Sequence, residues 1–186
     1  MTAIWNNFDD GSKSMEYYAD VLAKLGAATA SSADEIAGGL EKFAAVAETT
    51  GLSYEYAAAA LATITSETRQ SEDVVGTALK TIFARIENLK LGETLEDGLN
   101  LGQYSAALEK VGVNILDANG NLKEMDTILN NIAMQWNTLN NAEQVALAQS
   151  VAGIRQYNQF LALMGNWDVM EKNVELARDS TGELEK

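Results

Sequence analysis

The sequence predicts a mainly α-helical protein: a compact bundle of about eight short helices with one small β-hairpin near residues 113–123. Apolar residues recur at helical spacing through most of the chain, and its 186 residues include no proline, the strongest helix breaker. Serine, asparagine and glycine residues also stand where helices would begin and end. A chain of this length suits one hydrophobic core, so we expect a single helical domain over residues 1–186.

The first helical half, at about residues 12–110, is marked out mainly by capping residues. Ser32 and Glu35 match a capping box, in which each side chain satisfies backbone N–H groups at a helix start. The Gly38-Gly39 pair inside that helix indicates close packing against a neighbour, or a kink. The stretch "LGETLEDGLNLG" is expected to be a loop. The expected helices run from about Ser14 to Ala30, Ser32 to Gly51, Ser53 to Thr68, Ser71 to Leu89 and Tyr104 to Lys110.

The second helical half, at about residues 126–180, follows the same logic. Asp126 and Asn141 are expected to cap helices at about 126–139 and 142–152. Two further helices are expected at about 154–164 and 167–178. The polar tail "DSTGELEK" is expected to fray.

Between the halves, residues 111–123 change their hydrophobic period. Apolar side chains alternate with small or polar ones from Val111 to Ile115, a period of two. Asn119-Gly120 is a strong hairpin signal, because both residues tolerate the positive φ of a type I′ turn. Asp117 to Gly120 also suits a type I turn, with aspartate first and glycine fourth. We therefore expect a hairpin that packs on the helices.

A calcium-binding loop is the competing interpretation of this stretch. Asp117, Asn119 and Asn121 alternate like the first ligands of an EF-hand. That loop needs glycine at its sixth position and glutamate at its twelfth, where this chain has Leu122 and Ile128. We therefore expect no metal ligands here and no cofactor.

Composition excludes several classes of function. The 27 acidic and 13 basic residues give a net charge of −14, which argues against binding DNA or an anionic membrane through a basic surface. A basic partner is possible but not required. The absence of cysteine and histidine excludes Ser–His–Asp and Cys–His catalysis. No apolar run approaches the ~20 residues of a membrane span, and no secretory signal opens the chain. We expect a soluble intracellular protein that is part of a longer one.

No residue stands out as catalytic. With 27 acidic residues, almost any fold brings two carboxylates to glycosidase spacing, so a solvated acidic surface is the favoured interpretation. Arg85 and Arg155 lie beside apolar stripes and are expected to form ion pairs or caps rather than to anchor a ligand. Four aromatic residues at helical spacing among aliphatic ones are expected in the core: Phe83, Trp136, Phe160 and Trp167.

Four blocks of sequence, in order, resemble the conserved core of phage tail tape measure proteins, a class of phage-related minor tail proteins. They are "SSADEIAGGLEKFAAVAETTGLSYEYAAAALATI", "VGTALKTIFARIENLK", the predicted hairpin with the helix ending near Trp136, and "EQVALAQSVAGIRQYNQFLALMGNWD". The likeness extends from about Tyr17 to Glu183 and is weakest in the loop of residues 91–102. The second and fourth blocks rest on Gly76, Thr77, Ala78, Leu79, Lys80, Arg85, Ile86, Gly153, Arg155, Gln156, Asn158, Asn166, Trp167 and Asp168.

The resemblance implies a structural virion protein of a long-tailed phage or prophage. Such proteins occupy the tail-tube lumen, set tail length during assembly and leave ahead of the DNA during infection. The implied location is the virion tail, and the bacterial host cytoplasm during assembly. The implied partners are tail tube and tail-tip proteins and tail assembly chaperones, with self-association of the full-length protein. For this segment the resemblance implies no catalytic residue and no contact with nucleic acid or membrane.

The expected role depends on length. As one continuous helix, 186 residues would span only about 280 Å, whereas a ruler for a tail of ~1,000 Å needs several hundred residues. We therefore expect a globular segment of a longer ruler. Two alternatives remain: a non-enzymatic helical module for protein binding or assembly, and a cell-wall hydrolase that acts through two carboxylates.

Overall fold

The structure is a computed structural model that describes residues 2–180. Over this range the chain forms ten α-helices and no β-strand, so the mainly α-helical prediction is confirmed. The tail from residue 181, where most of the expected fraying falls, lies outside the described residues. The helices are α1 (Thr2–Phe8), α2 (Met15–Ala28), α3 (Ala33–Thr50), α4 (Tyr54–Thr68), α5 (Glu72–Lys90), α6 (Leu101–Glu109), α7 (Met125–Trp136), α8 (Asn141–Ala152), α9 (Tyr157–Gly165) and α10 (Trp167–Arg178).

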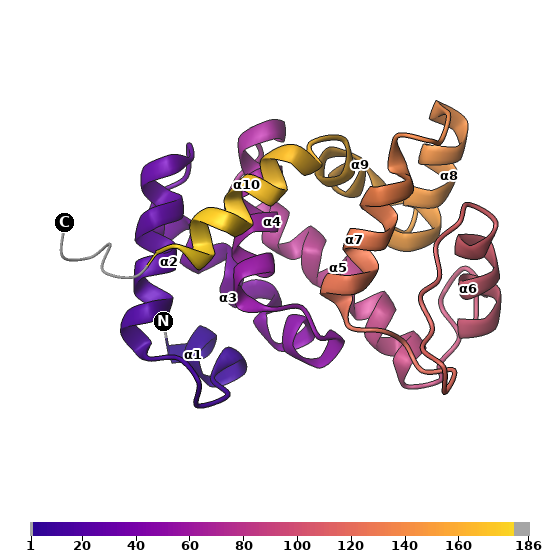
Figure 1. Ribbon diagram of the computed structural model, residues 1–186, viewed down its shortest axis with the longest axis horizontal. Coiled ribbons are helices and arrows are strands. Elements are labelled where there is room, and N and C mark those ends of the chain that lie inside the picture. Colours follow the sequence, from indigo (N-terminus) through magenta and orange to yellow (C-terminus); the bar gives the residue numbers. More distant parts are fainter. Residues whose placement is uncertain (1, 181–186) are drawn as a thin grey trace.

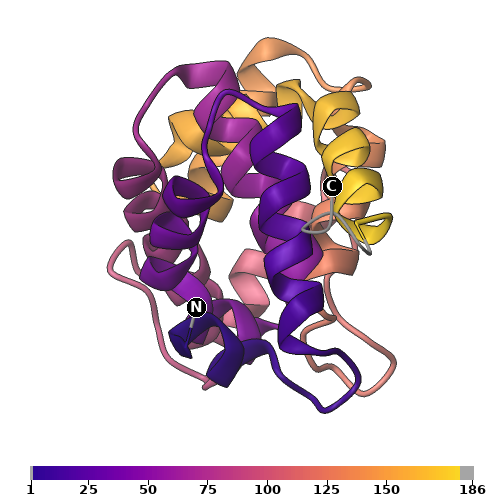
Figure 2. The same cartoon turned by 90° about the vertical axis from the view of Figure 1, so that its left-hand side faces the viewer.

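The helices form two groups with α5 running from one to the other (Figure 1). The first group holds α1 to α4 together with α10, and the second holds α6, α7 and α8. Seen from the end that carries α1, α2 stands between α3 and α10 (Figure 2). The last helix of the sequence therefore packs on helices from its first half.

α4 is the central helix and is buried on every side. α2, α3, α5, α9 and α10 pack against it, and the alanine-rich run of residues 57–62 is fully buried. A helix that is apolar all round is typical of a core position. Because an alanine side chain is one methyl group, each neighbouring helix can approach α4 closely.

α3 and α5 cross closely at two glycines. A methyl group on Gly76 would lie 2.5 Å from the carbonyl oxygen of Gly39, and one on Gly39 would lie 2.9 Å from the carbonyl oxygen of Glu72 in α5. Side chains at these positions would push the helices apart, so glycine is required for this approach. The structure thus assigns the predicted close packing to Gly39, whereas Gly38 faces open space.

Most predicted helix ends are confirmed because their signals are local. The structure confirms the capping box of Ser32 with Glu35, the left-handed stop at Gly51, and the caps Ser53 and Ser71. Several boundaries differ from the expectation. α6 begins at Leu101, inside the expected loop, with Asn100 as its cap, and α7 ends at Trp136 rather than near residue 139. Asn140 rather than Asn141 caps α8, in a capping box with Glu143. The ninth helix begins at Tyr157, since α8 ends at Gly153 with φ 82° and a turn follows.

The predicted β-hairpin near residues 113–123 is wrong. Within the described range this stretch forms one isolated antiparallel bridge, between Leu116 and Leu122. Its turn is the type I alternative, in which the Gly120 amide donates to the carbonyl oxygen of Asp117 at 3.1 Å. Asn119 does not have the positive φ that a type I′ turn requires.

The backbone before this turn explains why no strand forms. The Val113 amide donates to the carbonyl oxygen of Leu108 at 3.0 Å, so it belongs to the end of α6. Val113 and Ile115 are buried, and Asn114 between them is exposed. The alternation of apolar and polar residues therefore reflects alternating burial along an irregular segment, and not the hydrogen-bonded pairing of two β-strands.

Asp126 does not cap α7 as expected. It lies inside the first turn, and the preceding Glu124 makes no side-chain cap bond. The Asp126 carboxylate instead accepts the backbone N–H of Ser53 at 2.9 Å, at the start of α4. Its partner is distant in sequence, so local patterns do not reveal it.

Candidate functional site

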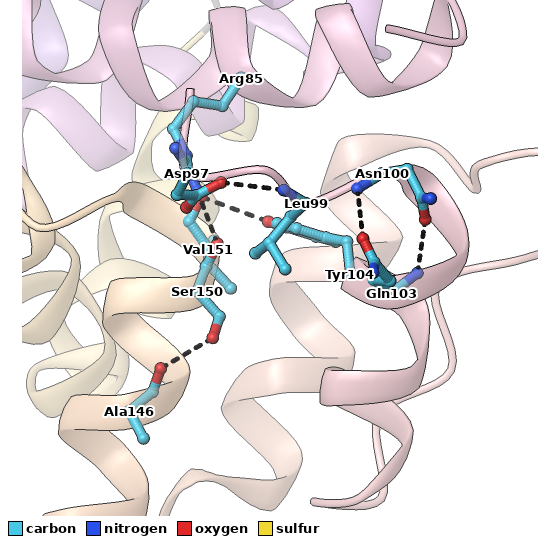
Figure 3. A network of polar contacts seen from close by, with 9 residues as sticks. All are labelled: Arg85, Asp97, Leu99, Asn100, Gln103, Tyr104, Ala146, Ser150 and Val151. Atoms are coloured by element: carbon cyan, nitrogen blue, oxygen red, sulfur yellow. Dashed lines mark hydrogen bonds and ion pairs between the residues drawn. The ribbon is translucent and has the colours of Figure 1, made fainter. Parts of the chain in front are cut away.

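Arg85 joins α5 to the loop that follows it and to the end of α8 (Figure 3). Its Nη2 donates to Oδ2 of Asp97 at 2.9 Å and to the carbonyl oxygen of Ser150 at 3.1 Å. Beside it, the hydroxyl of Tyr104 on α6 donates to the carbonyl oxygen of Val151 at 3.3 Å. Four segments of the chain therefore meet at the C-terminal end of α8.

The charge at this helix end explains the choice of arginine. The last carbonyl groups of a helix carry partial negative charge, which a guanidinium group stabilises. The Arg85 side chain is 14% exposed. Burial acts to raise the pKa of the Asp97 carboxyl, but hydrogen bonds from Arg85 and the Leu99 amide, with the Arg85 charge, outweigh it and lower that pKa. The expected ion-pairing role of Arg85 is confirmed.

Arg85 also brings together two blocks that are distant in sequence. A methyl group on Gly153 would lie 3.3 Å from Nη1 of Arg85, so this glycine leaves room for the guanidinium.

The expected core positions of Phe83, Trp136 and Phe160 are confirmed by their burial. Arg155, by contrast, is exposed.

Trp167 differs from the expectation, because it is only partly buried and lines a groove. This groove of about 480 Å³ lies between α4, α7 and α10. Its base is aromatic, with the ring centroids of Tyr56 and Trp167 6.5 Å apart, and Asn130 of α7 donates to the Tyr56 hydroxyl. We call it the α10 groove; its wall includes Tyr56, Trp167, Glu171, Glu175, Arg178 and Asp179.

A second groove, of about 350 Å³, lies between α1, α2 and the start of α4. Here Nζ of Lys13 lies 4.6 Å from the centroid of the Tyr17 ring, a cation–π contact. We call it the α1 groove; its wall includes Asp9, Asp10, Lys13, Tyr17, Glu48 and Glu55.

The two grooves are neighbours around Tyr17 and Arg178. The Tyr17 hydroxyl donates to Oε1 of Glu55. Burial first, and then this carboxylate, raise the pKa of Tyr17, while the charge of Arg178 acts in the opposite direction. The Arg178 guanidinium itself lies 5.7 Å from the centroid of the Tyr56 ring. A strip of aromatic rings and carboxylates thus extends from α1 to α10.

Asp126 lies next to this strip, and its environment bears on the hydrolase alternative. Burial raises the pKa of its carboxyl, the hydrogen bond from Ser53 opposes the rise, and the negative charge of Glu55 adds to it. A carboxyl with a raised pKa beside a second carboxylate is an arrangement that acid–base catalysis uses. Asp126, however, already bonds the backbone at Ser53 and lines neither groove, so its geometry favours a structural role.

Neither a metal-binding cluster nor a membrane-spanning helix is found within residues 2–180. No cluster of three or more acidic side chains there is placed to hold a metal ion. Asp117, the first residue of the possible calcium loop, accepts the amides of Asn119 and Asn121 at 2.8 and 3.0 Å. Over the same range no helix has the length and apolar character of a membrane span.

Sequence reasoning missed both grooves, because each wall combines segments that are separated in sequence: residues 7–18 with 48–55 in the α1 groove, and Tyr56 with residues 167–179 in the α10 groove. One local signal could have indicated the α10 groove. Glu171, Glu175 and Asp179 follow each other at intervals of four, a spacing that places carboxylates on one face of a continuous helix.

Comparison with known proteins adds the family. No solved structure matches the chain. The family model described as phage-related minor tail protein matches residues 1–153. The matched range contains the α3–α5 crossing and Arg85 with its partners, and it ends before α9 and α10. Most of this chain is thus covered by one family model, and the chain belongs to the family of phage-related minor tail proteins.

Proposed function

We propose that this chain is a segment of a tape measure, the protein that sets tail length during assembly and occupies the tail tube. Membership of the phage-related minor tail protein family is the observation that carries the proposal, since it supports a structural role in the phage tail. The four sequence blocks that resemble a tape measure core add the finer role. The chain then works in the virion tail and, during assembly, in the host cytoplasm.

The fold supports a globular segment rather than a rod. The longest helix, α5, has 19 residues and is therefore about 28 Å long. Helices this short, packed around α4, cannot measure a tail of ~1,000 Å by themselves. We propose that residues 1–186 act as one folded domain and that other segments of the same polypeptide supply the length.

Tail length provides the test. Inserting about 100 strongly helical residues into the reading frame that encodes this chain should lengthen tails by about 150 Å in electron micrographs, at 1.5 Å per residue. The same insertion in a tail-tip protein is the control and should leave length unchanged. Intact tails of normal length from the first insertion would refute the ruler role. A tail reconstruction that shows these residues as one unbroken rod would refute the globular segment.

The two grooves favour a second candidate, a helical module for protein binding during assembly. The candidates differ in where the chain ends up. A tape measure remains in the finished virion, whereas an assembly adaptor is left behind with the assembly intermediates. Mass spectrometry of purified virions and of tail intermediates separates them, since peptides confined to the intermediates would favour the adaptor.

The proposed role is non-enzymatic. Its proposed partners are tail tube and tail-tip proteins, assembly chaperones and further copies of the full-length protein. Incubating the chain with peptidoglycan should release no muropeptides. Clear release that is lost in Asp126→Asn would overturn this part of the proposal.

A further inference from the structure

We propose that the α10 groove and the neighbouring α1 groove form a docking surface for a basic protein segment, a stretch of another chain that presents arginine or lysine side chains. This proposal concerns binding chemistry only. It stands whether the chain is a ruler segment or an assembly module.

The charges of α10 are the first observation. Glu171, Glu175 and Asp179 are exposed, line the groove and are spaced four residues apart, the first two on one face of α10 and the third at its C-cap. Like charges at this spacing repel each other, and acidic groups near a helix C-terminus oppose the helix dipole. The arrangement therefore destabilises α10 itself, and a cationic partner in the groove would relieve it.

The aromatic walls are the second observation. Tyrosine and tryptophan rings attract a cation placed over their faces. In this structure two tyrosines already do so with cations of the same chain: Lys13 lies over Tyr17, and Arg178 lies over Tyr56. These two contacts are cation–π contacts within the chain, and an arginine or lysine of a partner would make the same kind of contact.

Charge complementarity selects the occupant. The α1 groove adds the carboxylates of Asp9, Asp10, Glu48 and Glu55, against one cation, Lys13. A second copy of this chain would bring another net charge of −14 and would be repelled. Over both grooves, the seven carboxylates of the walls outnumber two cations, Lys13 and Arg178, so a segment with several positive charges meets net attraction, through its contacts with the carboxylates and with the open aromatic surface.

A charge-reversal pair tests the surface. A fluorescein-labelled peptide of alternating glycine and arginine is titrated with the chain in low salt and followed by fluorescence anisotropy. Glu171→Lys/Glu175→Lys should weaken its binding about tenfold, because two attractive contacts become repulsive. The matched control, Glu93→Lys/Glu96→Lys, makes the same change of net charge at exposed positions of the loop after α5. It should change binding less than about threefold.

A second pair tests the occupied ring. Arg178→Gln removes the chain's own cation from Tyr56 and should tighten peptide binding about threefold. Lys172→Gln changes the charge of the same helix equally, at a residue that does not line the groove, and should have a smaller effect. In nuclear magnetic resonance spectra, the indole signal of Trp167 should shift with peptide, while that of the buried Trp136 should not.

The outcomes separate the alternatives. Equal weakening by the two charge-reversal variants, or an unshifted Trp167 signal, would reduce the binding to non-specific attraction and overturn the proposal. A peptide of glycine and glutamate that binds equally well would overturn it too. Sedimentation that shows dimers of the chain alone, abolished by Glu171→Lys/Glu175→Lys, would assign the surface to a second copy instead.

Discussion

Replacing Gly76 with alanine should destabilise the fold by about 2–3 kcal/mol, because the added methyl group has no room between α3 and α5. It would lie 2.5 Å from the carbonyl oxygen of Gly39 and 3.1 Å from the α-carbon of that residue. Ordinary contact needs ~3.5 Å, so the helices would have to separate by about 1 Å. Both contacting atoms are backbone and cannot rotate away. Separation would also loosen the buried contact of Phe43 with Phe83, whose ring centroids are 6.0 Å apart.

Gly38→Ala is the matched control, on α3, the other helix of the crossing. It makes the same chemical change one residue before Gly39, but a methyl group there would have no atom within 4 Å. Alanine is a better helix former than glycine at an exposed position, so this variant should gain about 0.5–1 kcal/mol. The same substitution thus has opposite expected signs at two positions.

Urea unfolding followed by far-ultraviolet circular dichroism measures both changes. In thermal scans Gly76→Ala should lower the melting temperature by about 5–10 °C, and Gly38→Ala should raise it by about 2 °C. If Gly76→Ala is as stable as the native chain, or if both variants lose the same stability, close approach is not the reason for glycine at the crossing.

Three further predictions concern polar residues. Arg85→Met should lower the free energy of unfolding by about 2–3 kcal/mol, because it leaves the end of α8 without its cation. The control Lys80→Met, on an exposed part of α5, should lower it little, and equal unfolding midpoints of the two variants in urea would contradict this prediction. Burial raises the pKa of Asp126 above 3.8, so its contribution to stability is complete below that pH and is lost as pH rises through the raised value. Asp126→Asn should therefore be more stable than the native chain at pH 7, and in urea titrations the difference should vanish near pH 3. A difference in stability that grows on acidification would contradict a raised pKa of Asp126 in the folded chain. Asp117→Ala should lose about 1 kcal/mol with its two turn bonds. Millimolar calcium should shift the melting temperature of the native chain no more than magnesium does, and a calcium-specific shift lost in this variant would restore the metal site.

The parts of the fold that sequence predicts are those decided by neighbouring residues. Ser32 finds Glu35 three residues away, and Gly51 ends its helix through its own backbone conformation. α1 escaped prediction for the opposite reason. It has seven residues, and its fully buried Ile4 packs in a core formed by later helices. Contacts across the fold, not a local signal, hold this helix.

The candidate site also depends on contacts between residues that are distant in sequence, which local patterns do not reveal. The α10 groove combines Tyr56 with residues of α10 more than 100 positions later, and hydrophobic spacing cannot report such a meeting. Trp167 illustrates the error that results. Its spacing among aliphatic residues predicts the core, and it does pack on Tyr56, but it lines the α10 groove and is only partly buried.

The burial of α4 also sets the order in which this chain can fold. The part of α4 that packs on α10 is shielded from water only when α10 has docked, and α10 is the last described helix to leave the ribosome. Until residues 167–178 are synthesised, that part of the core stays uncovered. Completion of the core is therefore a late event. A chain cut short before Trp167 would leave this part of α4 exposed and would be prone to aggregate.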